Sequence, residues 1–149
     1  MKKERILVSA CLLGINCKYN GGNNFNEKVL KLMETYELIP VCPEQLGGLS
    51  TPREPSYLSC KAEEILEGKG RVLSRNKDVT QNFLRGAEET LKIARMYGVK
   101  KAVLKEGSPS CGKNLTYYEE GKGEGMGITA ALLKKNGIEL ISEEELERF

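Results

Sequence analysis

Apolar and polar positions follow two different periods along the chain. Continuous runs of apolar, β-favouring residues predict buried strands, and apolar residues spaced three or four apart predict helices that bury one face. On this basis strands are expected at residues 5–13, 37–42, 99–106 and 138–142. Helices are expected at residues 26–36, 78–97 and 126–137.

The helix over residues 78–97 has the clearest apolar stripe, with Asp78 or Thr80 as its cap and Gly98 after its last turn. Two segments show no such regularity. Residues 43–60 hold several prolines and a glycine pair, which predicts a long loop. Residues 65–74 suit either a hairpin or a third strand, and residues 143–149 a terminal turn.

Alternating strands and helices predict an α/β fold. We expect residues 1–149 to form a single three-layer domain with a mostly parallel central sheet. In such sheets ligands bind beyond the carboxyl ends of the strands. Side chains that follow the strands are therefore the first place to look for a site.

Composition narrows the class of protein. There are 23 basic and 21 acidic residues, a net charge of +2, which argues against a large nucleic-acid footprint. No apolar run is long enough to span a bilayer. The start resembles a short lipoprotein signal ending at Cys11, but its apolar stretch is only five residues long. We therefore expect a cytoplasmic protein with reduced thiols.

Three of the five cysteines lie at the end of a predicted strand or a few residues beyond it: Cys11, Cys42 and Cys111. Glycine or proline flanks each of them, so each thiol sits in a constrained turn. A parallel sheet would bring all three to its carboxyl edge. The alternative is that they are small buried hydrophobic residues. Cys17 is either a fourth ligand or a bystander, and Cys60 is expected to be a bystander.

The types of residue point to one kind of metal centre. Zinc sites usually have closely paired cysteines and often histidine, and this chain has no histidine. Soft thiolates also suit iron–sulfur clusters. Three thiolates on a 4Fe–4S cluster would leave one iron without a protein ligand, and that iron could act as a Lewis acid. A cluster that only carries electrons usually has four cysteine ligands.

Several motifs together match a known family. In chain order they are SACLLG (9–14), CKYNG (17–21), PVCPEQLGGL (40–49), TPREP (51–55), DVT (78–80), FLRGA (83–87), LKEGSPSCG (104–112) and GMGITAALL (125–133). Over nearly its whole length the chain resembles the thiouracil desulfidase (TudS) family, formerly a domain-of-unknown-function family. The resemblance implies non-redox desulfuration of thiolated uracil, for example 4-thiouracil to uracil plus hydrogen sulfide. It also implies a three-cysteine-ligated 4Fe–4S cluster whose open iron binds the substrate sulfur.

By motif position the resemblance assigns the cluster ligands to Cys11, Cys42 and Cys111, and catalytic roles to Glu44 and Ser108. Glu44 would then be the general base for an attacking water, since no histidine competes for that role. Ser108 would orient the water or hydrogen-bond to the base, or would simply cap its turn. One departure is Asn20, where the family often has aspartate.

Two further features have both a functional and a neutral interpretation. Lys105 would supply positive charge near the site, or would be a solvated lysine. Glycines alternate at 121, 123, 125 and 127 before the helix at 126–137. This run would bring helix amides to a ligand, or would form a mobile loop.

Other functions remain open at this stage. A non-enzymatic iron–sulfur redox sensor or electron carrier would need Cys17 as a fourth ligand. A metal-free enzyme with Cys111 as nucleophile would lack the usual histidine base. The expected partner is a small-molecule thiolated pyrimidine base, and thiouridine in a nucleoside or tRNA is the alternative substrate. The sequence carries no indication of the oligomeric state.

Overall fold

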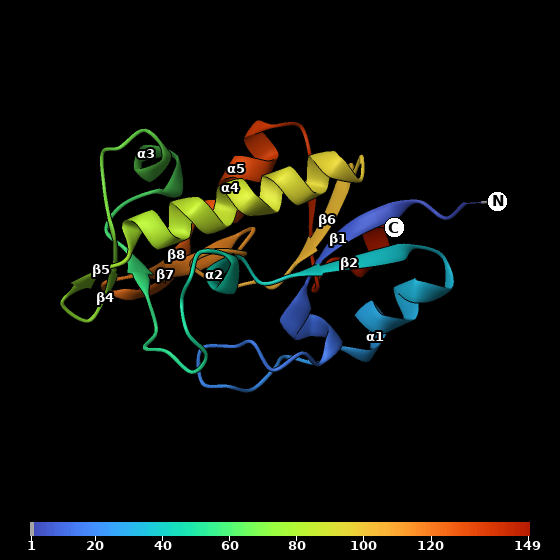
Figure 1. Ribbon diagram of the computed structural model, residues 1–149, viewed down its shortest axis with the longest axis horizontal. Helices are drawn as coiled ribbons and strands as arrows, with labels where there is room; N and C mark the ends of the chain where they lie inside the picture. The colour runs from blue at the N-terminus through green and yellow to red at the C-terminus, as the bar shows by residue number, and fades with distance from the viewer. Residues whose placement is uncertain (1) are drawn as a thin grey trace.

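The computed structural model describes residues 2–149. A four-stranded parallel sheet occupies one half of the molecule, with strand order β2-β1-β6-β9 (Figure 1). Its strands are β1 (Arg5–Ser9), β2 (Glu37–Val41), β6 (Lys101–Leu104) and β9 (Glu139–Ser142). The helices are α1 (Glu27–Leu30), α2 (Pro43–Leu46), α3 (Ala62–Leu66), α4 (Thr80–Met96) and α5 (Ile128–Lys135).

Helices and turns cover both faces of the parallel sheet. In β1, Leu7 points to one face and Ile6 and Val8 to the other, as the alternation along a strand requires. Leu7 packs in a cluster with side chains of α4 and α5. Ile6 and Val8 pack against α1 and the C-terminal turn. The predicted α/β class with a parallel sheet is confirmed.

The order of the strands places a topological switch point between β1 and β6. From β1 the chain moves to β2 on one side, and it then crosses to β6 on the other side. Connections that leave in opposite directions open a crevice outside the carboxyl ends of the two strands. The residues that follow β1, β2 and β6 therefore surround the place where an α/β fold most often binds its ligand.

A second, mixed sheet was not expected from the sequence. Its order is β5-β4-β3-β7-β8, and it lies at the other end of the molecule from β1 and β2 (Figure 1). Its strands are β3 (Tyr57–Leu58), β4 (Val72–Ser74), β5 (Lys77–Asp78), β7 (Leu115–Tyr118) and β8 (Gly121–Glu124). Helix α4 runs along both halves, and Phe83 near its start packs with Leu58 and Val72 of this sheet.

The structure shortens two of the predicted elements. The strand expected at 5–13 ends at Ser9, because the chain turns through a 3₁₀ helix, Ala10–Leu13, that stops at Gly14 with φ of 91°. The helix expected at 26–36 is α1 followed by a 3₁₀ turn, Lys31–Glu34. Met33, in this 3₁₀ turn, is 53% exposed.

The two irregular segments contain regular structure. The predicted loop 43–60 includes α2 and β3, and residues 65–74 contain the end of α3 and then β4. The predictions for β6, β9, α4 and α5 are confirmed with shorter ends. The N-cap of α4 is Val79, without a side-chain capping bond, rather than Asp78 or Thr80 as predicted. Asp78 lies one residue earlier, where its carboxylate accepts a hydrogen bond from the Thr80 amide at 2.9 Å.

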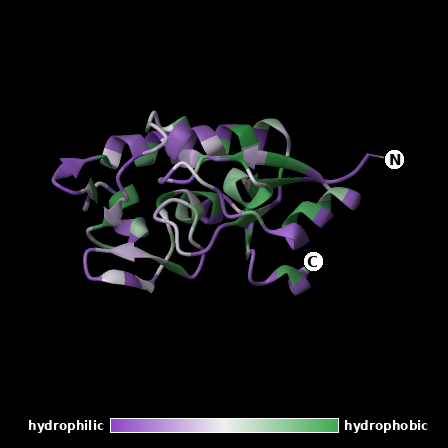
Figure 2. Cartoon of the chain, turned by 90° about the horizontal axis from the view of Figure 1, so that it is seen from below, coloured by the Kyte–Doolittle hydropathy of each residue, from purple (hydrophilic) through white to green (hydrophobic). Residues whose placement is uncertain are grey.

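Hydropathy follows this architecture. In Figure 2 the strand that follows the N-terminal tail is green, whereas the tail and several outer loops are purple. Within residues 2–149, none of the helices has the length and apolar character that crossing a membrane requires.

Candidate active site

A cavity of about 740 Å³ lies at the carboxyl ends of β1, β2 and β6. Four thiols line it: Cys11, Cys17, Cys42 and Cys111. Charged and hydroxyl groups stand beside them: Glu44, Arg53, Lys105, Ser108 and Ser110. The second sheet supplies aromatic residues to the wall: Tyr57, Tyr117 and Tyr118. The cavity is therefore shared by the two sheets, with the thiols on the side of the parallel sheet.

Three of these thiols follow three neighbouring strands. Cys11 lies in the 3₁₀ turn after β1, Cys42 directly follows β2, and Cys111 lies in the loop after β6. All three line the cavity, where burial and, to a smaller extent, the charge of Cys42 raise the pKa of both Cys11 and Cys111. The structure thus brings together the three cysteines that were singled out from the sequence.

Two of the three thiols are held in their neutral form. Burial raises the pKa of Cys111 to about 12. Burial also raises the pKa of Cys11, against the effect of the Asn24 amide, which donates to its sulfur at 3.4 Å. Thiolates at these positions need a positive partner, and a metal centre that binds them would release their protons.

Cys17 lies beside Cys42 at the same cavity. It is 2% exposed, and the Cys42 Sγ lies 3.6 Å from its carbonyl oxygen. The interaction between the two side chains lowers the pKa of Cys42 and raises that of Cys17. Cys60 does not line the cavity, which agrees with the expectation that it takes no part in the site.

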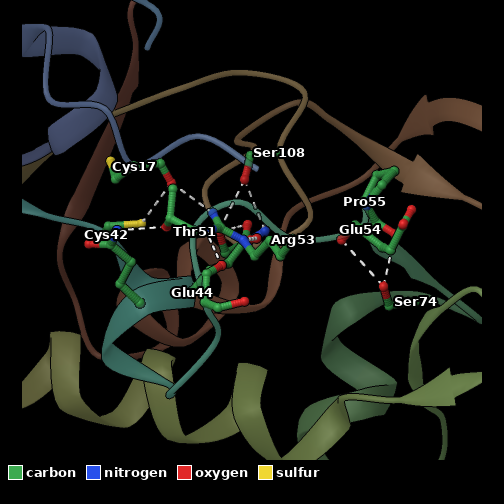
Figure 3. Close-up of polar contacts among 12 residues, drawn as sticks. Cys17, Cys42, Glu44, Thr51, Arg53, Glu54, Pro55, Ser74 and Ser108 are labelled. Carbon is green, nitrogen blue, oxygen red and sulfur yellow. Dashed lines mark hydrogen bonds and ion pairs between the residues drawn. The ribbon is translucent and has the colours of Figure 1, made fainter. Parts of the chain in front are cut away.

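The carboxylate of Glu44 is paired with a buried arginine. Arg53 Nε donates to Glu44 Oε1 at 2.9 Å, and the two side chains are 8% and 12% exposed. The other nitrogens of Arg53 donate to the carbonyls of Cys17 and Ser50 and to Thr51 Oγ1 (Figure 3). The motif TPREP (51–55) gives no indication of this contact, since only the fold brings Arg53 to Glu44.

Ser108 caps its own turn, as its neutral interpretation held. Its Oγ accepts hydrogen bonds from the amides of Ser110 and Cys111 at 3.1 and 3.0 Å. The same oxygen lies 3.1 Å from Ser110 Oγ. Ser110 Oγ in turn donates to Glu44 Oε2 at 3.0 Å. Ser110 is therefore a second site residue that the sequence analysis missed, although it lies in the same SPSC motif.

A buried carboxylate holds the loop that carries Cys111. Glu106 accepts hydrogen bonds from the amides of Lys113, Asn114 and Leu115 and from the Asn114 side chain, all within 2.9 Å. Burial favours the neutral acid, but these four donors outweigh it and keep the pKa of Glu106 below its usual value of 4.5. The ionised Glu106 carboxylate therefore holds the two ends of the Cys111 loop together.

Helix α5 fixes the other side of this loop. The amides of Gly127, Ile128 and Ala130 donate to the carbonyls of Gly112, Pro109 and Ser110 at 2.8–3.0 Å. Neither earlier interpretation of the glycine run is correct. The run forms strand β8 and the start of α5, and these helix amides are used by the Cys111 loop rather than by a ligand.

The structure also places Lys105 and Asn20. Lys105 Nζ lies at the cavity, 3.2 Å from Glu143 Oε2, so it is an ion-paired residue rather than a solvated lysine. Asn20 Oδ1 accepts from the Gly22 amide at 2.9 Å on the surface. Because an aspartate oxygen can accept the same bond, the departure from the family pattern leaves this turn intact.

The arrangement of donors does not suit a single metal ion. Across residues 2–149, no three side chains of histidine, cysteine, aspartate or glutamate gather closely enough to hold one ion. A single zinc draws its thiolates to about 2.3 Å from one centre. Thiols spread around one cavity fit a larger, multi-iron centre better.

Comparisons with known proteins agree with this geometry. Residues 6–145 match the family of 2-thiouracil desulfurase. The chain is 43% identical over 146 residues to the uncharacterized protein YbbK of Bacillus subtilis (strain 168), covering 95% of this chain and 97% of that one. It also resembles the solved structure of the [4Fe-4S]-dependent thiouracil desulfidase TudS, with a TM-score of 0.81, 38% identity, and 98% of this chain and 95% of that one covered. The chain therefore belongs to the 2-thiouracil desulfurase family.

Proposed function

We propose that this protein removes sulfur from a thiolated uracil, such as 4-thiouracil, and releases uracil and hydrogen sulfide without net redox change. The observation that carries the proposal is the meeting of three thiols and a carboxylate–serine network at one cavity. The family and the likeness to a [4Fe-4S]-dependent thiouracil desulfidase support the same chemistry.

The residues present fit a 4Fe–4S cluster. Cys11, Cys42 and Cys111 would hold it, since they follow three adjacent strands and face one cavity. When bound, the cluster would supply an open iron, a soft Lewis acid that suits the sulfur of a thiocarbonyl. Asn24, which already donates to the sulfur of Cys11, would orient one ligand and tune the cluster.

The remaining chemistry falls to the carboxylate and the serines. Glu44 would take a proton from the water that attacks the ring carbon, and Arg53 keeps this carboxylate in place. Ser108, at the cavity wall, would hydrogen-bond to the base, and Glu44 would pass the proton that it took to the departing sulfur. Overall, a thiocarbonyl and water become a carbonyl and hydrogen sulfide, so both protons of the water end on sulfur.

The cavity suits a small ring as substrate. Tyr57, Tyr117 and Tyr118 offer aromatic surface against which a pyrimidine would pack. A free thiolated base is the substrate we propose, because the net charge of +2 gives little attraction for folded RNA. Thiouridine as a nucleoside or in tRNA is the alternative, and parallel assays on the three substrates separate them.

The test is anaerobic purification, analysis of iron and acid-labile sulfide, and measurement of sulfide released from 4-thiouracil. The wild type is compared with Cys17→Ser and with Cys60→Ser, which removes a thiol outside the cavity. We expect about four irons per chain and sulfide release from all three proteins. Cys111→Ser should lose the cluster. A wild type that holds the cluster but releases no sulfide from any thiolated pyrimidine would refute the proposal.

One observation favours a second function. Cys17 lies at the cavity beside Cys42, where it is placed to be a fourth thiolate. Four thiolates would leave no open iron and would suit an electron carrier or redox sensor. Under that function Cys17→Ser loses the cluster, and the wild type shows reversible reduction without release of sulfide.

A further inference from the structure

Cys17 and Cys42 form a pair of neighbouring thiols at the cavity. Cys17 lies in the loop after the 3₁₀ turn Ala10–Leu13, and Cys42 directly follows β2. The Cys42 Sγ lies 3.6 Å from the Cys17 carbonyl oxygen, and the two side chains also interact with each other (Figure 3). Cys42 is a proposed cluster ligand, whereas Cys17 has no part in the proposed desulfuration. The question is what a second thiol does beside a ligand.

Contacts of the protein itself hold the pair together. Arg53 Nη2 donates to the Cys17 carbonyl at 2.9 Å, and the Arg53 amide donates to the Tyr19 carbonyl at 2.7 Å. Cys42 is fixed from the other side, because Pro43 begins α2 directly after it. None of these contacts involves a cluster. The two thiols are therefore neighbours in the cluster-free chain, when Cys42 is not bound to iron.

The two thiols differ in their exposure. Cys42 is partly exposed at the cavity of about 740 Å³, which a molecule as small as hydrogen peroxide can enter. Cys17 is only 2% exposed. An oxidised cysteine beside a second thiol condenses with it to a disulfide, and without such a neighbour it is oxidised further. The pair thus has the arrangement of an accessible thiol backed by a buried one.

The other two thiols at the cavity have different neighbours. The Asn24 side-chain amide donates to Cys11 Sγ at 3.4 Å. The Ser110 hydroxyl lies 3.8 Å from Cys111 Sγ. Neither of these contacts is with a thiol. The arrangement therefore favours a bond within the Cys17–Cys42 pair over a bond from Cys42 to either of the others.

We propose that Cys17 is a resolving thiol, which forms a disulfide with Cys42 in the cluster-free chain and so protects this ligand from irreversible oxidation. The inference rests on the proposed role of Cys42 as a cluster ligand. Hydrogen peroxide oxidises the Cys42 thiol to a sulfenic acid, and its O–O bond breaks to give one water. The Cys17 sulfur then attacks the Cys42 sulfur, and the sulfenic oxygen leaves as a second water.

This step balances, and it is reversible. The two thiols lose two electrons and two protons, and one peroxide gains them to become two waters. A dithiol reductant returns the disulfide to two thiols. While the disulfide exists, Cys42 cannot bind iron. A new cluster would therefore bind only after the pair has been reduced.

The test uses the full-length chain, freed of its cluster with a chelator under anaerobic conditions and then treated with a small excess of hydrogen peroxide. Remaining thiols are alkylated and counted, and the peptides are mapped by mass spectrometry without reduction. In the wild type the five free thiols should fall by two, with a cross-link between Cys17 and Cys42. Dithiothreitol should restore both thiols, and reconstitution with iron and sulfide should then restore the original iron content.

Cys17→Ser and Cys60→Ser are the matched variants. Cys17→Ser has no resolving thiol, so peroxide should convert Cys42 to a sulfinic acid, which dithiothreitol does not reduce. This variant should bind as much iron as the wild type before oxidation, which shows that it folds, and should lose most of that capacity afterwards. Cys60→Ser removes a thiol outside the cavity and should match the wild type in cross-link and iron content.

The outcomes separate this inference from the proposed function. A wild type without a cross-link, or with one that joins Cys42 to Cys11 or Cys111, overturns the inference. Recovery of iron in oxidised Cys17→Ser as complete as in the wild type also overturns it. The map of the wild type needs no variant, so it decides the matter even if Cys17→Ser does not fold. Loaded wild type that is inactive on every thiolated pyrimidine refutes the proposed function and leaves the cross-link result unaffected.

Discussion

Arg53 joins several segments of the chain at the cavity through its hydrogen bonds. Its guanidinium binds the Glu44 carboxylate, the carbonyls of Cys17 and Ser50, and the hydroxyl of Thr51. These partners come from three separate segments of the chain. Because an arginine offers five donors in a rigid plane, one side chain can fix all three segments relative to one another.

Replacing Arg53 by glutamine should therefore be costly. Removing one partner of a buried ion pair leaves an uncompensated charge, so we expect the free energy of unfolding to fall by about 3–5 kcal/mol. Denaturant titration measures this. The control is Arg71→Gln, which breaks an ion pair on the surface, where the side chains of Arg71 and Asp78 are 70% and 46% exposed. It should lower the free energy of unfolding by less than about 1 kcal/mol. Equal losses in the two variants would contradict this role for Arg53.

Glu106 should make stability depend on pH. Its pKa is lower in the folded protein than in the unfolded chain, so its stabilisation is complete above about pH 4.5 and is lost as pH falls through the folded pKa. At pH 7, Glu106→Gln should lower the free energy of unfolding by about 1.5–3 kcal/mol. Unfolding curves at pH 7, 5 and 3 should show this difference shrinking on acidification. A difference that stays constant over this range would show that ionised Glu106 is not responsible.

At the scale of elements, the position of Glu44 depends on how α2 packs. Helix α2 has only four residues, too few to be stable alone. It lies against α4 with glycines at the contact: a Cβ on Gly86 would lie 2.0 Å from the Pro43 carbonyl oxygen. Asn82 of α4 also donates to the Gly47 carbonyl at 2.9 Å. The close contact of two backbones places both Cys42 and Glu44.

Gly86→Ala tests this contact, because packing and helix propensity predict opposite results. In an exposed helix the change would stabilise by about 1 kcal/mol. Here the added methyl group must displace the backbone of α2, so we expect a lower melting temperature and a lower iron content per chain. Glu88→Ala, at an exposed position of the same helix, should alter neither. A more stable Gly86→Ala with full iron content would show that α2 is not held this way.

For the whole molecule, the cluster would join the carboxyl ends of three strands. Loops after β1, β2 and β6 would be tied to one another through Cys11, Cys42 and Cys111. A centre that binds only the folded chain stabilises it by its binding free energy. The cluster should therefore raise the free energy of unfolding, and it should do so only when all three cysteine ligands are present.

Removing the cluster with a chelator under anaerobic conditions should lower the melting temperature by about 5–10 °C. Calorimetry of loaded and cluster-free protein measures the difference. Cys60→Ser should show the same difference as the wild type, and Cys111→Ser should show none. Equal melting temperatures for loaded and cluster-free wild type would mean that the cluster does not tie the strands together.

The hydrophobic pattern predicted the elements that bury apolar residues at regular intervals. Strand β6, strand β9 and helix α4 have such patterns because they pack in the core. The hairpin of β7 and β8 was missed, since β8 has the sequence GKGE and none of its residues is buried. Because β8 borders the cavity and buries none of its residues, its sequence does not alternate between apolar and polar positions.

What the sequence determined alone is the α/β class and the places where thiols follow strands, because both depend on local pattern and on the rule that parallel strands end at one edge. Cys11, Cys42 and Cys111 were found in this way. Only the tertiary structure decided that Arg53 and Ser110 meet Glu44 and that Cys17 lies beside Cys42. These contacts join residues 9, 66 and 25 positions apart, and no local period records which distant side chains a fold will bring together.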